Sequence, residues 1–228
     1  MEKVLKRKKT VSVVKEPGSS TRQVILTRAN EIINEVGMVD FRIDALATSL
    51  GLSPGNITYH FPKKEDIGNA IWEQSNKEII AALDHYITPL LDIKQLYLFY
   101  KFLVFHLYKY KGVVCYKLGD LGLLHKGKED YVGLAALVKE HFSHKMAFLA
   151  SNGYLVPIKD KGIMNLVYEA QLVCLGWWNN HAIATGKPEE DMNAVADKYA
   201  LIILYPLTPF LTEQGKKQYN GILSLIQK

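Results

Sequence analysis

One short segment of the chain combines hydrogen-bonding side chains with positive charge. It reads "LATSLGLSPGNITYHFPKKEDI" and covers residues 46–67. Asn pairs with adenine edges, while Ser, Thr and Tyr commonly hold phosphates. A helix face that only contacts water does not need so many hydrogen-bonding groups. The alternative is an ordinary polar surface helix. The segment therefore predicts a DNA contact made by Ser53, Asn56, Thr58, Tyr59 and His60.

Three further residues extend this predicted contact. Gly55 has no Cβ, so the backbone can approach a partner closely there. Lys63 and Lys64 follow at the start of the next helix, where a DNA backbone would pass. We therefore expect all three to belong to the DNA-binding surface.

The elements that must position these side chains are two short helices, expected over about 43–50 and 54–61. Gly51 lies between them and tolerates the left-handed conformation of a tight turn. Pro54 suits a first helical turn, where its missing N–H is not needed. Two short helices joined at a steep angle form a helix-turn-helix. The residues expected to face its core are Ala45, Leu46, Ala47, Leu50, Leu52 and Ile57.

Helical patterns also flank this motif. Ser20 and Gln23 predict a capped start for a first helix, and Gly37 predicts its end. A fourth helix is expected from Lys64 to about Tyr86. Longer and more apolar helices should follow at roughly 94–111, 113–125, 130–151, 161–185 and 189–208. No segment alternates as a strand would, so the predicted fold class is all-α.

The segment from Thr21 to Trp72 resembles the DNA-binding domain of the TetR family (tetracycline-repressor-like) of bacterial transcriptional regulators. The resemblance rests on "EVG", "DALATSLGLSPGNITYHF" and "KKEDI". It implies an N-terminal three-helix helix-turn-helix domain, joined by a fourth helix to a larger helical domain for ligand binding and dimerisation. The most telling family pattern is matched at Ile57, His60, Phe61, Lys64, Glu65 and Ile67.

Two positions depart from the family pattern. Arg42 stands where the family usually has Thr or Ser at the start of the second helix. Thr58 stands where the family usually has a Tyr that contacts phosphate. Arg42 could reach DNA where the usual hydroxyl does, and Tyr59 could take over the phosphate contact.

The expected domain organisation has three parts: a basic arm at 1–18, the helix-turn-helix domain at 19–79, and the regulatory and dimerisation domain at 80–228. Residues 1–22 hold seven basic and two acidic residues, a surplus equal to the net charge of +5 of the whole chain. Such an arm suits a polyanion such as DNA. The alternative is a solvated tail.

The rear domain is expected to bind a largely apolar small-molecule effector. Its aromatic and polar residues predict a pocket, although core packing is the alternative for each of them. We also expect a homodimer, because residues 163–178 are apolar almost all round and need cover on two sides. The next helix would offer a complementary stripe at Met192, Val195, Ala196 and Tyr199. The pocket residues expected are Phe102, Phe105, His106, Tyr116, Tyr168, Trp177, Trp178, Asn179 and His181.

Other classes of function have little support in the sequence. Cys115 and Cys174 are far apart in apolar surroundings, so we expect reduced thiols. His141 and His144 offer only two metal ligands, and no metal or cofactor is expected. The most apolar run is interrupted by Lys101, His106 and Lys109, which argues against a membrane span. No nucleophile–base pair or phosphate loop appears, so we do not expect an enzyme.

These observations predict a cytoplasmic, ligand-responsive transcriptional regulator. It would bind a pseudo-palindromic operator as a homodimer and act as a repressor. One alternative is a helical small-molecule-binding protein without operator-specific DNA binding, and another is an enzyme on a helical fold. Specific, salt-sensitive binding to double-stranded operator DNA would separate the first reading from both others.

Overall fold

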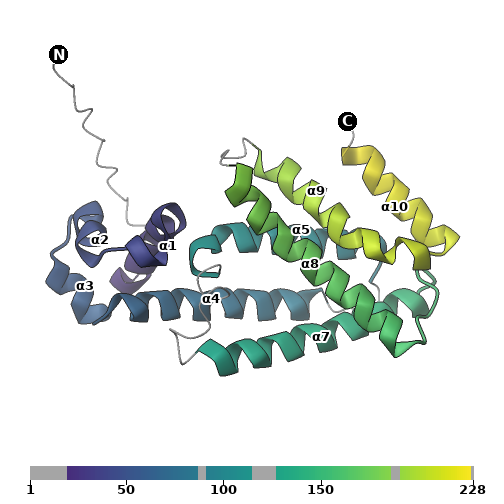
Figure 1. The fold of residues 1–228 in the computed structure, drawn as a ribbon, viewed down its shortest axis with the longest axis horizontal. Helices are drawn as coiled ribbons and strands as arrows, with labels where there is room; N and C mark the ends of the chain where they lie inside the picture. Colours follow the sequence, from purple (N-terminus) through teal and green to yellow (C-terminus); the bar gives the residue numbers. More distant parts are fainter. Residues whose placement is uncertain (1–19, 87–90, 115–126, 186–190, 227–228) are drawn as a thin grey trace, which may run out of the picture. The chain divides into compact units, whose positions relative to one another are not determined.

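The structure is a computed structural model that describes residues 20–86, 91–114, 127–185 and 191–226, without the side chains of 127–132 and 177–185. Its elements are helices, in agreement with the predicted all-α class (Figure 1). Contacts divide the chain into two units. The first holds the described residues up to Glu73 and a short segment that begins at Gly112. The second holds Gln74–Lys111 and the described residues after 126.

The first unit is built on α1 (Thr21–Asp40), α2 (Ile43–Leu50), α3 (Pro54–His60) and the start of α4 (Lys64–His85). Ser20 caps α1 as predicted, its hydroxyl accepting from the N–H of Gln23 at 3.3 Å. The regular helix breaks at Gly37, as predicted, although α1 as a whole continues to Asp40. Gly37 kinks the helix at φ 79° and ψ 161°, and a further turn follows, closed by the N–H of Phe41 on the carbonyl of Gly37.

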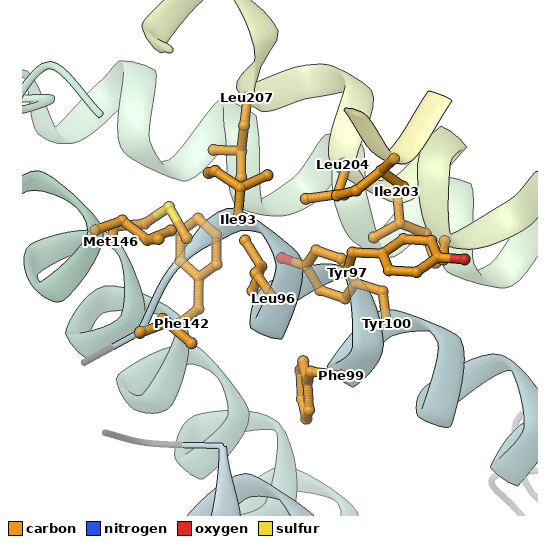
Figure 2. Close-up of a cluster of buried hydrophobic side chains, with 14 of the residues drawn as sticks. Ile93, Leu96, Tyr97, Phe99, Tyr100, Phe142, Met146, Ile203, Leu204 and Leu207 are labelled. Atoms are coloured by element: carbon orange, nitrogen blue, oxygen red, sulfur yellow. The ribbon is translucent and has the colours of Figure 1, made fainter. Parts of the chain in front are cut away.

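The second unit packs around α5 (Ile93–Lys109), which starts with a capping box between Asp92 and Gln95. Around it lie the rest of α4, α7 (Gly127–Ser151), α8 (Lys161–Thr185), α9 (Met192–Leu204), the 3₁₀ helix η1 (Tyr205–Phe210) and α10 (Glu213–Ile226). Figure 2 shows how side chains of α5, α7, α9 and η1 meet in this core, with Phe99, Tyr100, Phe142, Ile203 and Leu207 among them.

Several predicted elements differ from the structure. Most of the predicted helix at 113–125 lies outside the described residues, as does the basic arm. Helix α10 was not predicted. Val195, Ala196 and Tyr199 were expected to form a dimer stripe, but they are at most 9% exposed and belong to the core of their own unit. Among the described residues, no helix is both long and apolar enough to cross a membrane.

Two glycines on α10 allow the packing of this helix against its neighbours to be tested, because one is tightly packed and the other is open. A Cβ at Gly215 would lie 2.2 Å from the carbonyl oxygen of Tyr154, whereas a Cβ at Gly221 would meet nothing within 4 Å. Gly215→Ala should lower the free energy of unfolding by roughly 1–3 kcal/mol through overpacking. Gly221→Ala should raise it by about 0.5–1 kcal/mol through helix propensity. Urea denaturation measures both, and equal effects would contradict the packing of α10.

Candidate nucleic-acid interface and ligand cavity

The turn between α2 and α3 is closed by a left-handed glycine. Gly51 has φ 66° and ψ 26°, and the N–H of Leu52 donates to the carbonyl of Ala47 at 2.9 Å. This bond and the positive φ together form a Schellman ending, in which glycine avoids the steric cost of a Cβ. The turn therefore fixes where α3 leaves α2. Of the predicted inner-face residues on α2, Leu46 and Ala47 are buried, but Ala45 is exposed.

Helix α3 is held by its ends and by one buried side chain. The hydroxyl of Ser53 accepts from the N–H of Asn56 at 3.3 Å, and Pro54 occupies the first turn as predicted. Ile57 is fully buried and Phe61, directly after the helix, is 2% exposed. The guanidinium of Arg22 lies over the ring of Phe61, 4.8 Å from its centroid. These contacts leave the other side chains of α3 outside the core.

The exposed face of α3 carries the polar residues singled out in the sequence. Asn56, Thr58 and Tyr59 are exposed and His60 is half-buried. Tyr59 is 85% exposed and meets the ring of His60 edge-on at 5.2 Å. Thr58 donates its hydroxyl hydrogen to the carbonyl of Gly55 at 3.2 Å. The hydroxyl of Thr58 is thus tied to its own helix, while Tyr59 projects into solvent.

The three predicted cationic contacts lie in different environments. Arg42 is the N-cap of α2, is exposed, and makes no side-chain capping bond. The side chain of Lys63 is also exposed. Lys64 is half-buried and donates to the carbonyls of Met38 and Val39, at 3.3 and 3.0 Å. Its ammonium therefore satisfies carbonyls at the end of α1, a role that the sequence did not reveal and that competes with the predicted phosphate contact.

A cavity of about 210 Å³ lies within the second unit. Its wall is mostly apolar and draws on α4, α5, α7, α8 and α9. Of the predicted pocket residues, His106 and Tyr168 line it. Phe102 and Phe105 lie on α5 but do not line the cavity. The ring centroid of Phe102 lies 5.7 Å from that of His106. Tyr116 and the side chains of Trp177, Trp178, Asn179 and His181 lie outside the described residues.

His106 joins the cavity wall to α4. Its Nε2 lies 2.8 Å from the hydroxyl of Ser75, and both residues are buried. Burial lowers the pKa of His106 to about 4, against an opposing pull from Glu78. The imidazole is therefore neutral at physiological pH, and it serves as a hydrogen-bonding group rather than as a charge.

No metal site emerges from the part of the chain that the structure describes, since no three His, Cys, Asp or Glu residues gather there. His141 is buried, with its Nε2 4.0 Å from a carboxylate oxygen of Asp84. The Cys174 thiol is free and half-buried, and burial raises its pKa.

Comparison with protein families identifies the front of the chain. The model for "Bacterial regulatory proteins, tetR family" matches residues 25–71, which span most of α1, then α2, α3 and the start of α4. The resemblance seen in the sequence is therefore confirmed. The comparison with curated proteins found no match.

Solved structures share the fold over most of the chain. A TetR-family transcriptional regulator from Marinobacter aquaeolei VT8 is 20% identical with a TM-score of 0.72, covering 92% of this chain and 98% of that one. SmeT, the repressor of the Stenotrophomonas maltophilia multidrug efflux pump SmeDEF, is 16% identical with a TM-score of 0.58, over 86% and 92%. The TetR-family transcriptional regulator PfmR from Thermus thermophilus is 23% identical with a TM-score of 0.58, over 79% and 97%. The likeness confirms the fold, with a helix-turn-helix region followed by further helices.

Lys63 and Lys64 form a matched pair for testing this surface. Lys63→Ala should leave the free energy of unfolding within about 0.5 kcal/mol of the parent. It should reduce the slope of log affinity for DNA against log salt by about one. Lys64→Ala should instead lower the free energy of unfolding by about 1 kcal/mol, because two carbonyls lose their donor. The measurements are urea denaturation and DNA titration at several salt concentrations. If Lys64→Ala changes the salt dependence of DNA affinity but leaves the free energy of unfolding unchanged, Lys64 contacts phosphate as the sequence predicted.

Proposed function

Since this chain is a TetR-family DNA-binding transcriptional regulator, with the family's DNA-binding segment at residues 25–71, we propose that it is a ligand-responsive repressor that binds a pseudo-palindromic operator as a homodimer. The observation that carries the DNA-binding part is the exposed face of α3. Its hydrogen-bonding side chains project from a short helix whose direction is fixed by the Gly51 turn and by buried Ile57.

The proposed roles on DNA follow from exposure. Asn56 and Tyr59 would lie in or beside the major groove, where Asn can read adenine. Ser53, Gly55, Thr58 and His60 would line the nearby backbone, and Arg42 and Lys63 would supply charge to phosphates. A regulator with this function acts in the cytoplasm of a bacterial cell.

The homodimer is supported by an apolar stripe on α8. Ile163, Leu166, Ala170 and Val173 recur at helical spacing, and Ile163, Leu166 and Val173 are 43%, 70% and 68% exposed. On the adjacent helical segment, Ile202 and Tyr205 are also exposed, at 37% and 67%. Apolar side chains exposed in a row favour pairing with a second copy, and a two-fold pair suits two half-sites one DNA turn apart. This interface replaces the α9 stripe that the sequence suggested.

The ligand response is supported by the helices that wall the cavity. Ile79 and Leu83 of α4 line it, and α4 begins in the DNA-binding unit. Residues of α5 up to Leu107 also line it, and the chain re-enters the DNA-binding unit at Gly112. There the N–H of Gly112 donates to the side-chain oxygen of Asn34 on α1 at 2.8 Å. A ligand that shifts α4 or α5 could therefore change DNA affinity through both connections.

The repressor assignment follows from the mode of binding. A dimer seated on an operator within a promoter blocks access to that promoter, and an effector that weakens DNA binding relieves the block. Linkage requires operator DNA to weaken effector binding by the same factor. SmeT, one of the structures that share this fold, is itself a repressor.

The test of DNA binding uses a fragment from upstream of the protein's own gene. Tyr59→Ala should weaken specific binding by about 5- to 150-fold, the effect of roughly 1–3 kcal/mol for a lost base contact. Its free energy of unfolding should be unchanged, because the side chain is exposed. Leu225→Ala, which removes an exposed side chain on α10, is the matched control. Fluorescence anisotropy at two salt concentrations measures the affinity. Equal affinity for operator and random DNA in the parent protein would support the alternative of a small-molecule-binding protein without operator-specific binding.

The test of dimerisation places charge in the α8 stripe. Leu166→Glu and Val173→Glu should shift a micromolar dimer toward monomer, because buried carboxylates without partners are costly. Leu225→Glu, at a side chain 72% exposed on α10, should leave the dimer intact. Sedimentation velocity reports the species present. A parent protein that sediments as a monomer would rule out this interface.

A further inference from the structure

The cavity wall contains a buried lysine. Lys145 of α7 is 2% exposed, and its ammonium lies 4.3 Å from the ring centroid of Phe99. Among the described residues, its Nζ has no hydrogen-bond partner. Burial lowers the pKa of Lys145 to about 8, so the group is still mainly protonated at neutral pH. A buried cation without a counter-ion is costly, so an anionic partner would stabilise Lys145.

The described groups that surround Lys145 do not neutralise it. Asp84 of α4 raises its pKa, but that side chain is 72% exposed and forms no ion pair with Lys145. His141, one turn earlier on α7, has a lowered pKa because of its own burial. From α5, His106 is neutral and Tyr100 is protonated, because burial raises the pKa of its phenol. Tyr168 of α8 adds another phenol to the wall.

A second unsatisfied group in the same wall is also a donor. Gln171 of α8 is 5% exposed, and its side-chain oxygen accepts from the hydroxyl of Tyr100 at 2.8 Å. This bond leaves the Gln171 amide nitrogen without a partner among the described residues. Of the described buried atoms that lack partners, two belong to residues that line the cavity, Lys145 Nζ and Gln171 Nε2. A ligand that complements them must bring acceptors, and a negative charge suits Lys145.

We propose that this cavity binds a small monocarboxylate, with its apolar body against Phe99, Leu103 and Phe142 and its carboxylate toward Lys145 and Gln171. This inference rests on the proposed function, because it names the chemical class of the effector. The volume limits the size of the body. A cavity of about 150 Å³ holds benzene, so about 210 Å³ suits roughly eight or nine non-hydrogen atoms.

The first measurement compares shape-matched acids and amides. Isothermal titration calorimetry of the full chain, without DNA, would use hexanoate against hexanamide and benzoate against benzamide. Each pair has the same shape, but only the acid carries charge. We expect each carboxylate to bind at least tenfold more tightly than its amide.

The second measurement removes the charge. Lys145→Met should weaken carboxylate binding at least tenfold and change amide binding less than threefold, so that the preference disappears. Lys145→Gln should lose the same preference, and it provides a second variant if the first folds poorly. Lys217→Met removes an exposed charge on α10 and should retain the full preference. Circular dichroism checks that each variant is folded.

Three outcomes would overturn the inference: equal binding of acid and amide by the parent protein, a preference that survives both Lys145 substitutions, or binding of neither acid.

A final titration with operator DNA separates this inference from the proposed function. If an acid binds through Lys145 without changing DNA affinity, the carboxylate site is supported and the proposed ligand response is contradicted. A neutral effector that releases DNA from both the parent and Lys145→Met would support the response and overturn the carboxylate site.

Discussion

The second unit depends on one constraint, which is the burial of α5. This helix has large apolar or aromatic side chains on nearly every side, and Ile93, Leu96, Phe99 and Val104 are at most 4% exposed. A helix that is apolar on most sides must be covered on most sides, and on α5 the side chain of Leu98 stays 41% exposed. Helices α4, α7, α8, α9 and α10 supply that cover with side chains of the same core cluster. Figure 2 shows those of α7 and α9 against α5. The cavity is space beside α5 that these neighbours leave unfilled.

Hydrogen bonds from polar groups on α5 restrict the position of this helix along its axis more strongly than apolar packing does. The Tyr97 hydroxyl bonds to Asp197, that of Tyr100 to Gln171, and the His106 ring to Ser75. Each bond joins α5 to a different helix, and each would leave a buried polar group unpaired if α5 slid by a turn. Among the described residues that line the cavity, Lys145 and the Gln171 nitrogen depart from this pattern, because the protein supplies no acceptor for them. Ligand binding is a physical reason to retain such groups.

The helix-turn-helix could be predicted from sequence because its signals are local. Gly51, Pro54 and the apolar spacing to Ile57 lie within a few residues of the turn that they specify. The roles of Lys64 and Lys145 could not be predicted in this way. Lysine is normally a surface residue, and only the fold brings Lys64 to carbonyls 25 and 26 residues away or buries Lys145 beside Phe99. The inward face of α9 was missed for the same reason, since its apolar stripe fits a core and an interface equally well.

The proposed carboxylate site would give the proposed ligand response an energetic basis. A ligand can shift a conformational equilibrium only by its difference in affinity for the two states, and reversing a 99:1 ratio takes about 5.5 kcal/mol. Apolar contacts alone are spread over many residues and change little when helices move slightly. The free energy of a buried ion pair depends more strongly on the position of its partners, because removing one partner costs about 3–5 kcal/mol. If a carboxylate reaches Lys145 in only one arrangement of α4, α5 and α7, this single contact supplies most of the required difference. In the proposed response, α4 and α5 would carry the difference toward the DNA-binding unit, since each lines the cavity and the chain leads from each to that unit.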